Sequence, residues 1–310
     1  MDFLNALPGA SAQGLIWGLV AIGVYISYKI LDIADLTVDG SICTGGCVCA
    51  VLIGAGCPVW ISILAAFLAG ALTGVVTGLL HTLLGIPSIL AGILTQLMLY
   101  SINLLTLGGK SLLAISPWDN DLVVHMSDNT RSLIVLTLIA GATIYLLYQF
   151  FYTEVGLTLK STGDNPDMSR AQGVNVDRNK VIGLAIANGI VGLAGALLAQ
   201  YKGSANINDG RGAIVIALAA IFIGLSVSTK IKSNLVVSLI GVVVGGIIYY
   251  IVYTLVILMG LETDYLKLLS ALIVALFLGI PYLKSKYFTK HRDLRPSQIM
   301  EKVKGGNQDA

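Results

Sequence analysis

The chain has 310 residues, of which 56% are hydrophobic and only 12% are charged. A soluble domain carries about twice that charged fraction, so the composition excludes a soluble protein and predicts an integral membrane protein. The formal net charge of +2 gives no indication of nucleic-acid binding.

Apolar runs long enough to cross a bilayer recur along the chain, since crossing the hydrocarbon takes about 20 apolar residues. The second candidate is short and ends before Pro58, so it is either a thin or re-entrant span or no span. We expect an all-α polytopic membrane protein with about nine transmembrane helices. The candidates are 12–31, 43–57, 58–80, 86–106, 132–152, 181–201, 212–228, 234–259 and 264–283.

Lysine and arginine predict the orientation, because cytoplasmic loops are enriched in these residues. If the chain has nine spans and a cytoplasmic C-terminus, 14 of its 19 basic residues lie inside the cell. Seven of them are in loops and seven are in the tail. The N-terminus is then outside, and both the 153–180 loop and the basic tail, 284–310, are cytoplasmic. The inside residues are Lys29, Lys160, Arg170, Arg178, Lys180, Lys230, Lys232 and the seven from Lys284 to Lys304.

An internal repeat divides the chain. An Asp-Gly pair before an apolar run begins at Asp39 and again at Asp209, and a Gly-x-x-x-Gly pattern begins at Gly70 and again at Gly241. Five spans separate the copies, which therefore face opposite ways, as in transporters built from inverted repeats. Glycine-rich helices also resemble one another by chance. We predict one transmembrane domain, 1–283, whose inverted halves, about 12–152 and 181–283, are joined by 153–180.

The joining loop contains a short polar segment with helix-capping residues. Asn165 precedes a proline and suits the N-cap, Pro166 suits the first helical position, and Asp167 favours the positive helix end. Gly173 suits the left-handed residue after a helix. The predicted helix, Pro166–Gln172, is about 10 Å long and too short to be stable alone. We therefore expect a partner protein to hold it.

Four amides within the predicted spans are candidates to line a substrate pathway: Gln96, Asn103, Asn188 and Gln200. Polar groups are costly inside a membrane. The alternative for each is a hydrogen bond between helices. No charged residue falls in the middle of a predicted span, which argues against a proton relay and suits a neutral or zwitterionic solute.

No catalytic, nucleotide or metal site is predicted in this chain. Its three histidines are scattered, and the phosphate-binding pattern GxxxxGK[ST] is absent from the sequence, so any ATP energy must come from another chain. Four cysteines fall in one apolar stretch and suit small buried residues better than metal ligands or disulfides. They are Cys43, Cys47, Cys49 and Cys57.

The predicted outside segment 108–131 has two interpretations. Its polar residues, including Trp118 and Asp119, form either a docking surface for an external protein or an amphipathic piece that lies on the bilayer. Attraction to anionic lipid explains the basic tail without a special function.

The joining loop and its surroundings, STGDNPDMSRAQGVNVDRNKVIGLAIANGIVGLAGALLAQYKGSANINDGRG, resemble permease subunits of ATP-binding-cassette (ABC) importers of the branched-chain amino acid and ribose type. The stretches ILDIADLTVDGSICTGG and LLGIPSILAGILTQLMLYSINL agree with it. Together these stretches cover most of residues 14–260. The subgroup that this chain resembles is paired with a lipoprotein of the tryptophan- or tyrosine-binding kind.

The resemblance implies a type II importer fold in a bacterial cell membrane. Its implied partners are a second permease copy, two cytoplasmic ATPase subunits that bind ATP and Mg²⁺, and an extracytoplasmic substrate-binding protein. It also implies that the joining loop is the coupling helix, which sits in a groove of the ATPase. Gly163, Asp164, Asn165, Pro166, Ala171 and Gly173 match the family pattern, and Asp167, Met168, Arg170 and Gln172 are further contact positions.

We therefore expect the permease subunit of an ATP-driven importer, which is not itself an enzyme. Aromatic amino acids are the first candidate solutes, followed by branched-chain amino acids and then sugars or nucleosides. A symmetric homodimer requires no second kind of permease. The alternatives are an ATP-independent secondary transporter or channel, and a scaffold or membrane enzyme that transports nothing.

Overall fold

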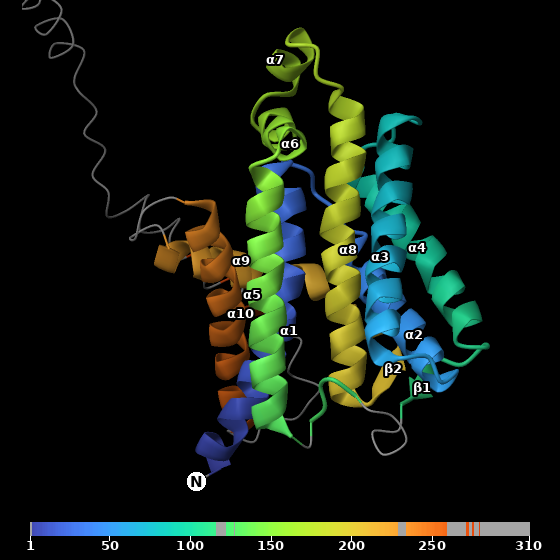
Figure 1. Ribbon diagram of the computed structural model, residues 1–310, viewed down its shortest axis with the longest axis vertical. Coiled ribbons are helices and arrows are strands. Elements are labelled where there is room, and N and C mark those ends of the chain that lie inside the picture. Colours follow the sequence, from blue (N-terminus) through green and yellow to red (C-terminus); the bar gives the residue numbers. More distant parts are fainter. Residues whose placement is uncertain are drawn as a thin grey trace, which may run out of the picture.

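The computed structural model describes residues 2–115, 122–126, 128–228 and 234–258, together with residues 271, 272, 275 and 279. Ten α-helices and one π-helical turn account for most of these residues (Figure 1). The helices are α1 (Asp2–Tyr25, continued by the π-helical turn η1, Ile26–Ile30), α2 (Val38–Gly54), α3 (Val59–Thr82), α4 (Ser88–Thr106), α5 (Asn129–Phe151), α6 (Glu154–Asp164), α7 (Pro166–Ala171), α8 (Val176–Lys202), α9 (Ala213–Ser228) and α10 (Leu235–Leu258).

The only strands in the described part of the chain form a small antiparallel ribbon at one end of the bundle. Strand β1 (Leu112–Ala114) pairs with β2 (Ser204–Asn206), with Leu113 opposite Ala205. We call this the sheet end and the opposite one the α7 end, because α7 lies at its tip (Figure 1).

Six helices in the described ranges are long and apolar enough to cross a membrane, and α2 and α9 are shorter apolar helices. A spanning segment in lipid must satisfy its backbone hydrogen bonds internally, which is why apolar runs of this length become helices. Eight of the nine predicted spans coincide with one of these eight helices. The ninth, 264–283, lies almost entirely outside the described residues, as do Trp118, Asp119 and the 284–310 tail.

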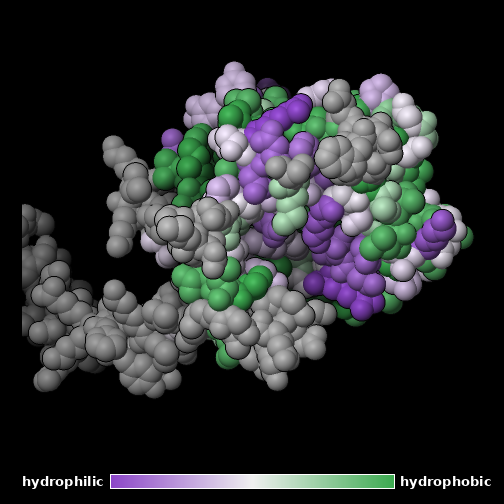
Figure 2. Space-filling model, turned by 90° about the horizontal axis from the view of Figure 1, so that it is seen from below, coloured by the Kyte–Doolittle hydropathy of each residue, from purple (hydrophilic) through white to green (hydrophobic). Residues whose placement is uncertain are grey.

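The outer helices present apolar side chains to the bilayer. Leu72 of α3, Leu97 of α4 and Leu138 of α5 are each more than 60% exposed, and no polar element covers them in the described structure. By contrast, α1 and α8 are mostly buried and form the centre of the bundle. From the sheet end, hydrophilic residues gather in the middle of the face, and apolar surface lies toward its edge (Figure 2).

The packing is reciprocal about the two central helices. Helix α3 packs along α8, and α10 packs along α1. Both pairs are antiparallel. Gly14 of α1 lies against Ile247 and Gly18 against Val243. Gly70 of α3 lies against Gly192 and Gly78 against Val181. Helices α1 and α8 also run in opposite directions, because Gly9 of α1 lies near Tyr201 and Gly23 near Ala187. The pair α1–α10 therefore has the same arrangement as the pair α8–α3, but with the helices pointing the opposite way. This is the arrangement expected of the inverted repeat.

The second span begins five residues earlier than the predicted 43–57. Helix α2 begins at Val38, and most of its residues are buried. The chain after η1 turns back into the bundle, and Asp35 is only 2% exposed. It is tolerated there because other elements supply its hydrogen bonds.

Candidate functional site

The short helix α7 projects beyond the bundle at the α7 end (Figure 1). Its N-cap is as predicted: Asn165 has an extended backbone, and its Oδ1 accepts a hydrogen bond from Met168 N at 3.0 Å. Pro166 occupies the first helical position. The helix ends at Ala171, one residue earlier than predicted, and Gly173 has the expected left-handed φ of +84°.

Most of the predicted contact residues face solvent. Met168 is 59% exposed, and Gly163 is half-buried. Asp164, Asn165, Pro166, Asp167, Arg170, Ala171, Gln172 and Gly173 are exposed as well. The outer surface of α7 is therefore free to bind another protein.

A buried serine fixes the inner side of α7. Ser169 is 3% exposed; its Oγ donates to the carbonyl oxygen of Asn165 at 3.0 Å and lies 3.3 Å from Ser161 Oγ. Arg170 lies 3.7 Å from both Asp167 and Asp177, but these side chains are largely exposed. Exposed ion pairs contribute little, so Ser169 and the caps hold α7 in place.

Helix α6, which lies within the predicted joining loop 153–180, connects α7 to the bundle. A Cβ atom at Gly163 would overlap the carbonyl oxygen of Ile30, so α6 lies directly against η1. Asn179 Nδ2 at the start of α8 donates to Thr162 Oγ1 at 3.0 Å. Leu159 of α6 is fully buried and lies beside Gly183 of α8. Helix α6 therefore contacts both central helices, α1 through η1 and α8 directly.

The four predicted pathway amides do not form one site. Gln96 and Asn103 of α4 line a cavity of about 160 Å³, together with Asp39 and Arg211. Asn103 is 2% exposed, and its Oδ1 has no hydrogen-bond partner among the described residues. Asn103 therefore places an unpaired buried acceptor beside a cavity that Gln96 also lines.

The other two amides are engaged within the protein. Gln200 Oε1 accepts from Val123 N at 3.3 Å, and its Nε2 donates to the buried Cys49 Sγ at 3.5 Å. Cys43 and Cys47 are buried as predicted, and Cys57 is half-buried. Asn188 is fully buried and bonded on both sides of its amide. Gln200 and Asn188 thus form hydrogen bonds within the bundle, which was the alternative to lining a substrate pathway.

Asn188 belongs to a buried polar network that the sequence analysis missed. Its Nδ2 donates to Asp35 Oδ2 at 2.6 Å, and its Oδ1 accepts from Ser41 Oγ at 2.6 Å. Ser41 Oγ lies 2.6 Å from Thr73 Oγ1. Asn188 is twelve residues beyond Val176, so it lies about 18 Å along a helix of about 40 Å. No predicted span has a charged residue at its middle, yet Asp35, which lies outside every predicted span, reaches the middle of α8 through this contact.

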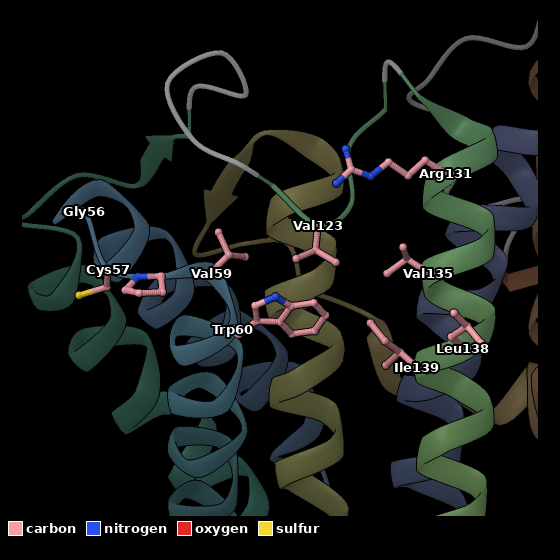
Figure 3. A pocket seen from close by; sticks show the side chains of 10 residues that line it. Gly56, Cys57, Val59, Trp60, Val123, Arg131, Val135, Leu138 and Ile139 are labelled. Atoms are coloured by element: carbon pink, nitrogen blue, oxygen red, sulfur yellow. The ribbon is translucent and has the colours of Figure 1, made fainter.

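A larger pocket of about 800 Å³ opens between α3 and α5 near the sheet end. Trp60 of α3 faces Leu138 and Ile139 of α5 across it, and Arg131 lies at its rim (Figure 3). Val123, from the segment before α5, closes the inner side. Apart from Arg131 the lining side chains are apolar or a thiol, so the pocket gives a polar solute few hydrogen-bond partners.

Comparisons with known proteins agree with this architecture. The family described as "Branched-chain amino acid transport system / permease component" matches residues 8–280. A protein of Clostridioides difficile named "Tyrosine transport system permease protein" is 34% identical over 277 residues, which are 89% of this chain and 91% of the relative. An uncharacterised protein of Rickettsia prowazekii is 32% identical over 287 residues, 89% of this chain and 98% of that protein.

No solved structure gives a significant match. The family match covers nearly the whole described bundle, including the α6–α7 projection and both central helices. This chain belongs to the family of branched-chain amino acid transport permeases and is a multi-pass transport subunit of an ABC-type system.

Proposed function

We propose that this permease imports a small solute, with energy from ATP hydrolysis on separate ATPase subunits, and that α7 is the coupling helix that contacts them. The observation that carries the proposal is the construction of α7. Its outer face is exposed, while its inner side is held by Ser169 and by the connection through α6. A projecting element of this kind transmits a push only if it is rigidly attached.

The α7 end lies in the cytoplasm in this proposal, as does the C-terminus, and the protein resides in a bacterial cell membrane. The sheet end then faces an extracytoplasmic substrate-binding protein. Two copies of this chain form a homodimer, and two ATPase subunits carry ATP and Mg²⁺. Closure of the ATPase dimer displaces α7, and the inverted halves rock around the solute route to alternate its access.

The solute in this proposal is an amino acid, with an aromatic one as the first choice. The support is the name of the Clostridioides difficile relative, a tyrosine transport permease. A zwitterion also suits a route that combines amides with a few charged side chains, as in the cavity lined by Asn103, Asp39 and Arg211.

Reconstitution into liposomes tests the proposal. The full complex of permease, ATPase and binding protein is expected to accumulate L-tyrosine only when ATP, Mg²⁺ and the binding protein are all present. Equal uptake of L-tyrosine with and without ATP would contradict ATP-driven import.

A second candidate is an ATP-independent secondary transporter or channel. The buried carboxyl group of Asp35 favours it, because buried ionisable residues often mark proton or ion routes. Liposomes that contain only this chain would then show solute flux without ATP. The importer predicts no such flux.

A further inference from the structure

An aromatic cluster lies between α1 and α10 toward the sheet end. The ring centroids of Trp17 and Tyr250 are 5.9 Å apart in a stacked arrangement. Tyr250 also contacts Tyr249 at 5.7 Å and Tyr253 at 5.6 Å. Trp17 and Tyr250 are 5% and 7% exposed, so their rings are fixed by packing. Such a cluster offers stacking and edge contacts to another aromatic ring.

These aromatic residues line a pocket of about 610 Å³ whose other wall is charged. That wall comes from the connection between α8 and α9 and includes Lys202, Asp209 and Arg211. Lys202 Nζ lies 2.9 Å from Asp209 Oδ1, so these two charges compensate each other. Arg211 is exposed and takes part in none of the ion pairs found among the described residues. The pocket therefore combines an aromatic wall with an arginine that no carboxylate of the described residues pairs with.

The backbone around Arg211 is held firmly. Its N–H donates to the carbonyl oxygen of Asn208 at 3.2 Å. The next residue, Gly212, donates its N–H to Asp39 Oδ2, and Ile214 N donates to Asp39 Oδ1, both at 3.0 Å. Asp39 thus anchors the start of α9 and fixes the position from which the guanidinium group extends.

Arg211 also lines the 160 Å³ cavity beside α4, so it stands between the two pockets. Asn103 lines that smaller cavity, and its buried Oδ1 has no hydrogen-bond partner in the described structure. An unpaired buried acceptor is costly and is satisfied by a ligand that donates a hydrogen bond. An ammonium group is such a donor.

We propose that Arg211 and the aromatic pocket form a binding site for an aromatic amino acid within the permease. The guanidinium group binds the carboxylate, the cluster of Trp17 and Tyr250 packs against the aromatic ring, and Asn103 accepts from the ammonium group. This inference rests on the proposed import of an amino acid and deepens it: the permease itself selects the solute, in addition to any selection by a binding protein.

Direct binding to the full-length permease in lipid nanodiscs tests the site without ATPase or binding protein. Radiolabelled L-tyrosine is expected to bind, with competition by L-phenylalanine. Tyramine, which lacks the carboxylate, and L-leucine, which lacks the ring, are expected to compete weakly. Arg211→Gln is expected to weaken binding by about tenfold or more, because a charge-assisted pair is lost.

Arg131→Gln is the matched control, since Arg131 is also exposed near the sheet end but lines the pocket between α3 and α5. It is expected to bind L-tyrosine like the unaltered chain. Tyr250→Leu is expected to reduce the preference for L-tyrosine over L-leucine, with unchanged elution on size exclusion as the check on folding. Failure of L-tyrosine to bind, equal competition by tyramine, or unchanged binding in Arg211→Gln would overturn the inference.

The outcomes also separate this site from the proposed function. If the full complex shows ATP-driven uptake but the permease does not bind L-tyrosine, the proposed site is contradicted and the proposed importer is supported. L-Tyrosine binding that depends on Arg211, together with no ATP-dependent uptake, would leave the site standing and contradict the importer.

Discussion

Asn188 Nδ2 donates a hydrogen bond to Asp35 Oδ2 over 2.6 Å, halfway along the central helix α8, although the two residues are 153 positions apart. Asp35 Oδ1 is also occupied, because it accepts from Thr37 N at 2.9 Å. The segment before α2 is therefore attached to α8 by a buried hydrogen bond between polar side chains. Packing of apolar side chains alone would not supply this hydrogen bond.

Replacing Asn188 with leucine tests that contact. The change removes one hydrogen-bond partner of Asp35 and one of Ser41 and leaves both polar groups buried, which costs up to about 1–3 kcal/mol per group. We expect a lower thermal unfolding midpoint of the purified permease. Asp32→Asn is the control, since Asp32 is exposed and has φ +55°, which asparagine also tolerates. Equal midpoints for Asn188→Leu and Asp32→Asn would contradict a structural role for the network.

The contact between α6 and η1 leaves no room for a side chain at Gly163. Gly163→Ala is expected to force the helices apart and to destabilise the protein by about 1–3 kcal/mol. Gly141→Ala in α5 is matched to it, because an added Cβ there meets nothing within 4 Å. That control is expected to be neutral, or stabilising by up to about 1 kcal/mol through helix propensity. Unfolding midpoints in detergent distinguish the two, and a neutral Gly163→Ala would refute the close packing of α6.

Cysteine labelling tests the orientation. Met168 at the α7 end and Lys110 near the sheet end are both exposed, and three of the four native cysteines are buried. In a Cys57→Ser background, a membrane-impermeant maleimide is expected to label Lys110→Cys in intact spheroplasts. Met168→Cys should react only after permeabilisation. The reverse pattern would place the α7 end outside and exclude contact with a cytoplasmic ATPase.

The spanning helices were predictable because length and apolarity determine them: α3, α4 and α10 begin and end within two residues of the expected limits. The start of α2 was missed because Asp35 and Asp39 are typical of a surface loop. Their partners are Asn188 and the N-terminus of α9, which only tertiary structure brings near. The residues next to Asp35 and Asp39 in the sequence do not indicate that distant residues form hydrogen bonds with these carboxylates.

The caps of α7 were predictable because Asn165, Pro166 and Gly173 act on their immediate neighbours. Helix α6 was missed, although a local signal existed. Thr153 accepts from Gly156 N as an N-cap, and Val155 and Leu159 follow at helical spacing. The approach of Arg211 to Trp17 and Tyr250 was beyond sequence reasoning, since it depends on how α1, α9 and α10 pack.

The most direct test of the account is the effect of a Pro166→Gly, Gly173→Val double change on the reconstituted transporter. Glycine removes the preformed first turn of α7, and valine is strained at φ +84°. Gly85→Val is the control, because Gly85 has φ +66° in the α3–α4 turn at the same end of the molecule. The account predicts that the double variant inserts normally but loses solute uptake and stimulated ATP hydrolysis, while Gly85→Val retains both. Survival of uptake and stimulated hydrolysis in the double variant would contradict α7 as the coupling helix.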